Sequence, residues 1–141
     1  MLFFQKYGTV YAAWDINWGF KVPKASQTIT VFENFEGRAP DQYVLCYYSE
    51  EKIKEVKELR IWNKIDKESY DILLKLVKKF ESDILNIYSD ERERYHKLFL
   101  DYPIQFDKNS LWFVKDKEDG SYIIATLNVN KGMLYVLEMY Y

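Results

Sequence analysis

The one cysteine and the one histidine of the chain are the first residues whose types suggest chemistry. A thiolate paired with an imidazole is a nucleophile with its base, and Cys46 and His96 are the candidates for these roles. Cys46, however, lies within the apolar run 43–48 and has no glycine beside it to shape a nucleophile turn. Because unpaired cysteines are among the most buried residue types, we expect Cys46 to be a core thiol.

A carboxylate and the imidazole share one face of an expected helix, since Glu93 precedes His96 by three residues. Carboxylate-bridged metal sites use this spacing but need a second copy on another helix, and the chain has no second histidine. We therefore expect a salt-bridged surface histidine and no bound metal or cofactor. The five glycines are far apart, so no phosphate-binding loop is expected either.

Asp41 followed by Glu50, Glu51 and Lys52 imitates the pattern of metal-dependent nucleases that ends in acid-x-Lys. In that chemistry the acids hold Mg²⁺ and the lysine supports the attacking water. The acid-x-Lys pair should then lie on a strand beside the aspartate. Here it follows Ser49, a good helix N-cap, and occupies a first turn in which acids are ordinary. The pattern therefore indicates the start of a helix.

Aromatic residues are unusually abundant, at 18% of the chain, with 13 Tyr, 9 Phe and 4 Trp. Many of them are expected in the core, since each buried ring removes a large area from water. Others lie beside polar residues, which is typical of protein interfaces, where Tyr and Trp combine an apolar body with a polar tip. The predicted partner-binding residues are Trp14, Trp18, Tyr88 and Tyr95, together with the acids Asp90, Glu91 and Glu93.

The N-terminal third is expected to form strands. Apolar and other residues alternate over 9–16, which is a strand period, and a further strand at 2–6 is expected to turn back into it at Gly8. The segments 28–32 and 43–48 are rich in β-branched and aromatic residues. They predict two more strands, with a loop at 34–40 between them.

The middle of the chain is expected to be helical. A short helix should begin at the Ser49 cap and end near Trp62, and a longer one should begin at Asp66, whose following apolar residues have a clear helical period. The stripe resumes after a polar segment at 89–94 and ends before Pro103. It predicts one long helix or two nearly collinear helices.

The C-terminal third predicts three strands, at 111–115, 122–127 and 133–141, joined by turns at Asp119-Gly120 and at 130–132. The order of strands, helices and strands indicates a single α+β domain over 1–141. We expect a mostly antiparallel sheet, made of the N-terminal strands and the C-terminal three-stranded meander. Two or three central helices should pack on one of its faces.

Charge and hydropathy exclude several classes of partner. The net charge is −2 and more than half of the charged side chains lie between 49 and 101 with their signs mixed. This distribution is typical of solvated helix faces and argues against direct nucleic-acid binding. No apolar run approaches the roughly 18 residues of a membrane helix, and a single cysteine fits a reducing compartment. We expect a cytoplasmic protein that does not bind membranes.

Two classes of function remain, together with a weaker third. In size, tyrosine content and mixed charge the chain resembles single-domain inhibitors, such as the immunity proteins paired with bacterial toxins and phage-encoded inhibitors of defence enzymes; the likeness is one of composition. It implies a protein partner, such as a toxin or nuclease, that is blocked by occlusion. The alternative is a small enzyme that uses paired carboxylates, with Asp15, Glu33 or Asp41 as candidates. The third is a nucleotide or small-molecule sponge that stacks its ligand on aromatic rings.

Overall fold

A six-stranded antiparallel sheet organises the chain, and its strand order is β1-β2-β6-β5-β4-β3. The computed structural model describes residues 2–35 and 40–141, with side chains from residue 10 onward. Residues 36–39 of the predicted 34–40 loop lie outside the described residues. The strands are β1 (Gln27–Asn34), β2 (Asp41–Tyr47), β3 (Asn63–Lys64), β4 (Leu111–Asp116), β5 (Tyr122–Asn128) and β6 (Met133–Met139).

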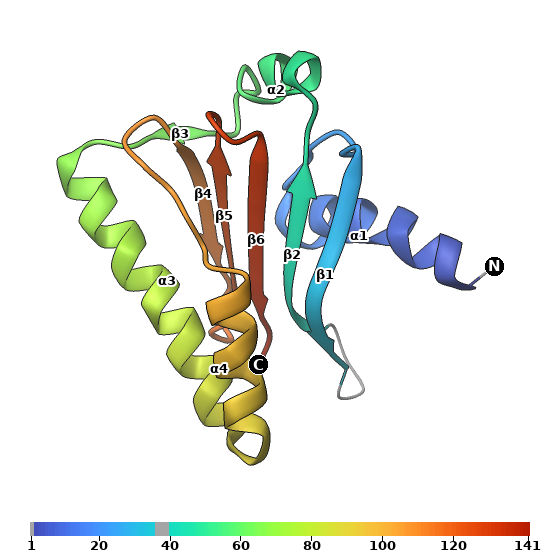
Figure 1. Ribbon diagram of the computed structural model, residues 1–141, viewed down its shortest axis with the longest axis vertical. Coiled ribbons are helices and arrows are strands. Elements are labelled where there is room, and N and C mark those ends of the chain that lie inside the picture. The colour runs from blue at the N-terminus through green and yellow to red at the C-terminus, as the bar shows by residue number, and fades with distance from the viewer. Residues whose placement is uncertain (1, 36–39) are drawn as a thin grey trace.

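Helices lie on both faces of this sheet. α3 and α4 cover one face, and α1 lies across the other, while α2 lies at one end of the strands (Figure 1). The α+β fold class and the packing of central helices on one face are thus confirmed. The helices are α1 (Leu2–Trp18), α2 (Glu50–Val56), α3 (Lys67–Ile87) and α4 (Arg92–Asp101), with a 3₁₀ turn, η1 (Ser89–Glu91), between the last two.

The central helices begin at the predicted caps. The Ser49 side chain accepts a hydrogen bond from the Lys52 N–H at the start of α2, and Asp66 and Ser69 cap one another's backbone at the start of α3. The buried residues of α3 then recur at helical spacing, so one stripe faces the sheet. That stripe consists of Leu73, Val77, Phe80 and Ile84.

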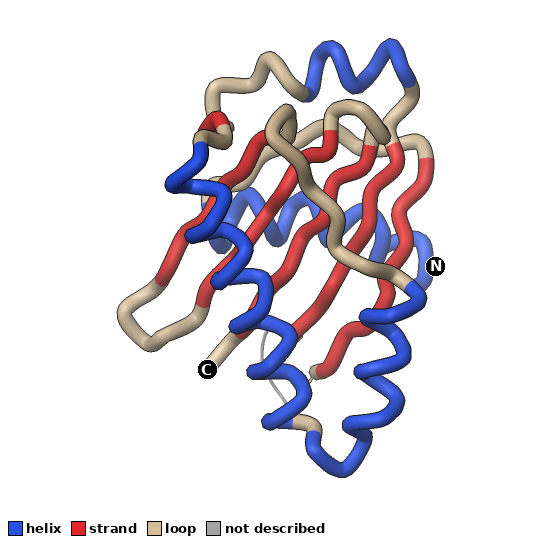
Figure 2. The backbone as a smooth tube through the Cα atoms, turned by 60° about the vertical axis from the view of Figure 1, so that its left-hand side comes forward, coloured by secondary structure: helices blue, strands red, loops and turns tan. Residues whose placement is uncertain are grey.

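The two helices after Asp66 are not collinear, which corrects the expectation from the sequence. α3 ends at Ile87, the backbone of Tyr88 is non-helical at φ −104° and ψ 47°, and η1 turns the chain back so that α4 returns along α3 (Figure 2). The reason is burial. Tyr95 and Phe99 bury their rings against the sheet, which a continuation of α3 past the sheet would leave exposed. α3, η1 and α4 thus form a helical hairpin.

The largest correction concerns the N-terminus, where the predicted strands at 2–6 and 9–16 are instead one helix, α1. Tyr11, Trp14 and Trp18 are spaced by three and four residues, so a helix places them on one face, and that face meets the sheet. In the predicted strand over 9–16, Ile16 would share the face of Trp14, but in the helix its side chain is 82% exposed. α1 ends at Trp18, and the next residue, Gly19, has a φ of +67°, the left-handed conformation that glycine adopts readily.

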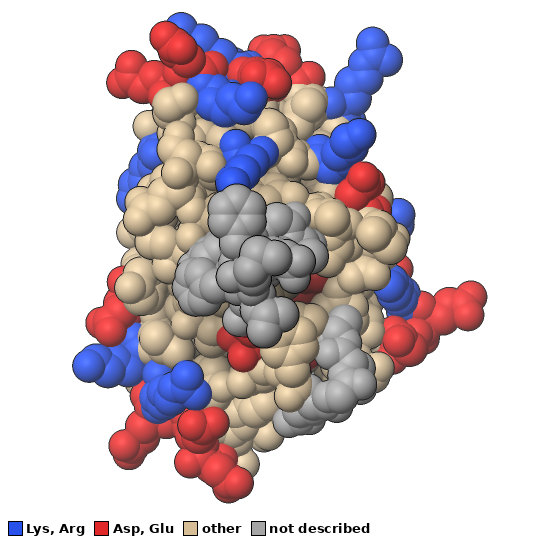
Figure 3. Space-filling view, turned by 90° about the vertical axis from the view of Figure 1, so that its right-hand side faces the viewer, with Lys and Arg blue, Asp and Glu red and all other residues tan. Residues whose placement is uncertain are grey.

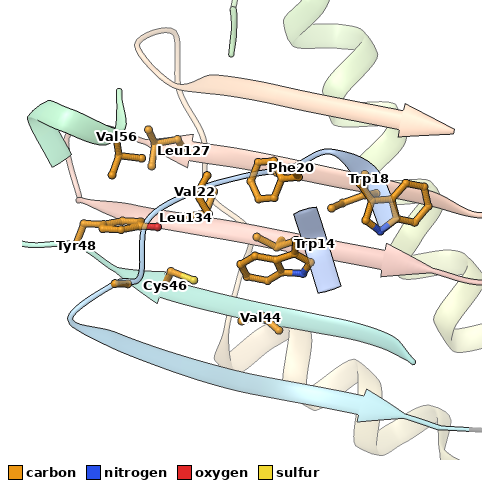
Figure 4. Close-up of a cluster of buried hydrophobic side chains, with 14 of the residues drawn as sticks. Trp14, Trp18, Phe20, Val22, Val44, Cys46, Tyr48, Val56, Leu127 and Leu134 are labelled. Atoms are coloured by element: carbon orange, nitrogen blue, oxygen red, sulfur yellow. The ribbon is translucent and has the colours of Figure 1, made fainter. Parts of the chain in front are cut away.

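The sheet separates two buried hydrophobic clusters. Strand β6 contributes side chains to both, because successive residues of a strand point to opposite faces of the sheet. Alternate residues of β6 and its continuation face α1, and the intervening ones face α3 and α4, as the alternation over 133–141 predicts. The cluster under α1 is completed by the segment that follows that helix, including Phe20 and Val22, which lies over the strands (Figure 4). The C-terminal meander β4-β5-β6 is likewise confirmed.

Candidate partner-binding surface

The turn between α3 and α4 forms one end of the molecule (Figure 1). It carries the three acids predicted to bind a partner, Asp90 and Glu91 in η1 and Glu93 in the first turn of α4, and all three are exposed. The helical hairpin therefore presents carboxylates at its tip. We call residues 88–95 the hairpin tip.

Two tyrosines fasten the hairpin tip to the sheet. The Tyr88 hydroxyl donates to Asp41 Oδ2 at 2.5 Å, and Asn34 Nδ2 donates to the Tyr95 hydroxyl at 2.7 Å. The two phenol rings also pack on each other, with their centroids 5.4 Å apart. Since Asn34 and Asp41 end β1 and begin β2, the tip is held against the sheet. Tyr95 is fully buried and Tyr88 half-buried, so they position the acids and offer little ring surface to a partner.

The arginines of the tip leave part of its negative charge uncompensated. Arg94 pairs with Glu91 at 3.2 Å and lies over the Tyr95 ring, while Arg92 turns back to the Leu85 carbonyl. No hydrogen bond or ion pair of the Asp90 or Glu93 side chain occurs among the described residues. Two exposed carboxylates on an anchored turn can therefore meet cationic groups of another molecule.

Trp14 and Trp18 lie elsewhere, in the core under α1, and so they are not brought together with the tip. Their exposed fractions are 0% and 1%, because both indoles face the sheet from α1. They leave no ring surface for a partner, in contrast to the role predicted for them. Of the predicted partner-binding residues, the structure brings together those of the hairpin tip.

Both indoles donate to a buried carboxylate that the sequence analysis did not single out, Glu138 of β6 (Figure 4 shows both indoles). Trp14 Nε1 and Gln42 Nε2 donate to Oε1 at 2.7 and 2.6 Å, and Trp18 Nε1 and the Tyr140 hydroxyl donate to Oε2 at 3.0 and 2.6 Å. Four donors match the acceptor capacity of a carboxylate. The sequence feature that could have identified Glu138 is that it is a single acid on the otherwise apolar face of the strand 133–141.

The thiol and the imidazole cannot act together. Cys46 lies in the cluster under α1, whereas His96 is exposed on α4, which packs on the opposite face of the sheet. Burial raises the pKa of the Cys46 thiol to about 12, and the Tyr11 hydroxyl donates to its sulfur at 3.5 Å. The expectation of a core thiol is thus confirmed, and a thiolate nucleophile is disfavoured.

The nuclease-like residues are likewise separated. Asp41 begins β2, whereas Glu50 and Glu51 begin α2 beyond the other end of that strand. Both Asp41 oxygens already accept hydrogen bonds, from the Tyr88 hydroxyl and from the Tyr140 N–H. Among the described residues, no group of three or more His, Cys, Asp or Glu side chains has the arrangement of a metal site.

The candidate catalytic carboxylates also do not converge. Asp15 is exposed on α1 and Asp41 is buried, and neither lines the small pocket that Glu33 shares with Glu138. That pocket measures about 140 Å³, below the roughly 300–1,000 Å³ of small-molecule sites. The three candidate acids Asp15, Glu33 and Asp41 thus do not meet at a substrate-sized cleft.

Charges of both signs are mixed on the surface near α1. Lys and Arg side chains lie among Asp and Glu side chains around the rim of this face (Figure 3). Along this rim no block of a single sign is visible of the kind that tracks a phosphate backbone. In the part of the chain that the structure describes, no helix has the length and apolar character required to cross a bilayer.

Comparisons with protein-family models, curated proteins and solved structures find no significant match.

Proposed function

We propose that this chain is a small cytoplasmic protein that inhibits a protein partner by occlusion, in the manner of immunity proteins or phage-encoded inhibitors. The observation that carries the proposal is the hairpin tip. Its Asp90 and Glu93 carboxylates are exposed on a turn that Tyr88 and Tyr95 fasten to β1 and β2. A turn held in this way loses little conformational freedom on binding, which favours affinity.

The tip sets the chemistry of the partner. The Asp90 and Glu93 carboxylates have no ion-pair partner among the described residues, so they are suited to a basic site on another protein. Charge complementarity of this kind speeds association and selects partners. Ile87, the last residue of α3, is 46% exposed beside the tip and supplies an apolar contact. If the partner is a nuclease or toxin that binds nucleic acid, the two carboxylates occupy the place of phosphates.

The test compares two charge reversals of equal size. The tip variant is D90K/E93K, and the control variant is E51K/E58K, whose exposed acids lie in and just after α2 at the other end of the sheet. Wild type and both variants are used as baits, and the activity of any stoichiometric partner is assayed with each. Partner capture and inhibition should be lost in D90K/E93K and kept in E51K/E58K.

Two outcomes would overturn the proposal. Retention of the partner by D90K/E93K would show that the tip is not the interface. Equal loss in both variants would show that the protein's net charge, and not the position of these acids, governs binding. Circular dichroism of both variants confirms beforehand that each is folded.

A further inference from the structure

A second surface feature lies at the other end of α3. A pocket of about 700 Å³ opens between the first turns of this helix and residues 106–108, which precede β4. This volume falls within the range of small-molecule sites. The 21 residues of α3 separate the pocket from the hairpin tip by about 30 Å, so the two features are independent.

Aromatic and aliphatic side chains form the wall of the pocket. The Tyr70 and Phe106 rings have their centroids 5.2 Å apart at an angle of 58°, and Ile65 lies beside them. All three side chains are partly exposed. The Tyr70 hydroxyl makes no hydrogen bond among the described residues, which leaves it available to a ligand. A flat apolar body can therefore pack against these ring faces.

Two carboxylates at the pocket are held in place by hydrogen bonds. Asp66 Oδ1 accepts the Ser69 N–H at 2.8 Å, and this bond, with the Ser69 hydroxyl, holds the pKa of Asp66 below its ordinary value. Asp107 Oδ1 accepts the Asn109 N–H at 2.9 Å. Because Asp66 itself caps α3, the positive end of that helix is occupied and does not attract an anion.

The remaining charges of the pocket are those of Asp71, Lys67 and Lys108. The lining therefore carries three acids and two lysines, an excess of one negative charge. Neither lysine forms an ion pair with these acids among the described residues. The carboxylates are thus not neutralised by ion pairs with these lysines and can interact with a charged ligand.

We infer that this pocket binds a planar organic cation, with an amidinium or guanidinium group directed to the carboxylates and a flat apolar body against Tyr70 and Phe106. Ring faces attract cations through their quadrupole. A planar cation also forms paired hydrogen bonds with carboxylates that a spherical ammonium does not match.

Three probes of one shape and different charge test this inference on the full chain. Benzamidine is cationic, benzamide neutral and benzoate anionic. Each is titrated while amide chemical shifts are followed by NMR. Benzamidine should bind with a dissociation constant of about 1 mM, and its shifts should centre on residues 65–71 and 106–108. Benzamide should bind more weakly and benzoate least. Equal binding of benzoate and benzamidine, or shifts centred elsewhere, would overturn the inference.

Variants of exposed side chains then separate charge from shape. Asp71→Asn should weaken benzamidine about two- to fivefold, and Lys108→Gln should tighten it by a similar factor, as the loss of one exposed charge implies. Phe106→Leu should weaken benzamide and benzamidine alike. Asp15→Asn makes the same change as Asp71→Asn at an exposed position on α1, on the other face of the sheet, and should leave benzamidine binding unchanged. If Asp71→Asn and Asp15→Asn have the same effect, only the net charge matters and the pocket is not the site.

Discussion

Replacing Glu138 by Gln changes one oxygen of a buried carboxylate into an NH₂ group and leaves the shape almost intact. The best arrangement keeps the amide oxygen on the Trp14 and Gln42 donors and turns the NH₂ toward Tyr140, whose hydroxyl can rotate to accept it. Trp18 Nε1 then loses Glu138 but retains the Tyr140 oxygen, which lies 2.9 Å away.

The cost follows from counting these bonds. The Trp14 and Gln42 bonds lose their charge assistance, the reversed Tyr140 bond loses it as well, and the Trp18 bond is lost, each change costing about 1 kcal/mol. We therefore expect Glu138→Gln to lower the free energy of unfolding by about 4 kcal/mol. With a urea m-value of about 1.5 kcal/mol per M, the unfolding midpoint falls by about 2.7 M.

Urea unfolding monitored by tryptophan fluorescence is the assay, since the indoles of Trp14 and Trp18 are buried beside Glu138. The matched control is Glu93→Gln, the same chemical change at an exposed position, which should alter stability by less than about 0.5 kcal/mol. If Glu138→Gln is as mild as Glu93→Gln, the hydrogen bonds from the four donors do not stabilise the fold and the reasoning is refuted.

Three further predictions concern single positions. Gly132→Ala should destabilise by at least about 2 kcal/mol, because φ is +65° and the added Cβ would lie 2.8 Å from the Tyr48 carbonyl oxygen. Gly19→Ala, at a similar φ but with only an ordinary contact of 3.7 Å to Lys115 Nζ, should cost only about 1–2 kcal/mol, and equal unfolding midpoints for the two variants would disprove the Tyr48 contact. Thr126→Val should stabilise by about 1 kcal/mol in thermal unfolding, because among the described residues this hydroxyl is the buried side-chain atom without a hydrogen bond; destabilisation would show that the hydroxyl has a partner. The Cys46 thiol should react with a disulfide reagent at pH 8 only after urea is added, because its pKa of about 12 keeps it protonated, and rapid reaction of the folded protein would contradict its burial.

The central helices and the C-terminal meander could be predicted from the sequence, because their signals are local. Asp66 precedes a long apolar stripe with helical spacing, and Asp119-Gly120 lies between two strand-like runs. In each case the capping or turn residue and the periodic pattern agree. Local signals of this kind specify an element before any distant contact forms.

The N-terminal helix could not be predicted because its apolar residues fit two periods. Val10, Trp14 and Ile16 alternate as a strand would, while Tyr11, Trp14 and Trp18 are also spaced as on a helix face. The choice between the two depends on distant partners: the Trp14 indole meets Glu138 of β6, 124 residues away. No pattern within eight residues contains that information, so tertiary packing overrode local alternation.

The candidate site, too, could be predicted from the sequence only in part. The acids Asp90 and Glu93 were found as a polar interruption of an apolar stripe, which is a surface signal in any fold. The burial of Trp14 and Trp18 was not predicted, because an indole near an acid is as typical of a buried hydrogen bond as of an interface. The turn that makes the hairpin was also missed, since residues 89–94 contain no glycine or proline to mark it.

Amide hydrogen exchange of the chain, alone and with a purified partner, tests the role of the hairpin tip most directly. Occlusion by the tip predicts that protection on binding is concentrated at residues 87–95 and leaves α2 unchanged. Protection confined to any other surface, with the tip amides exchanging as in the free chain, would contradict it.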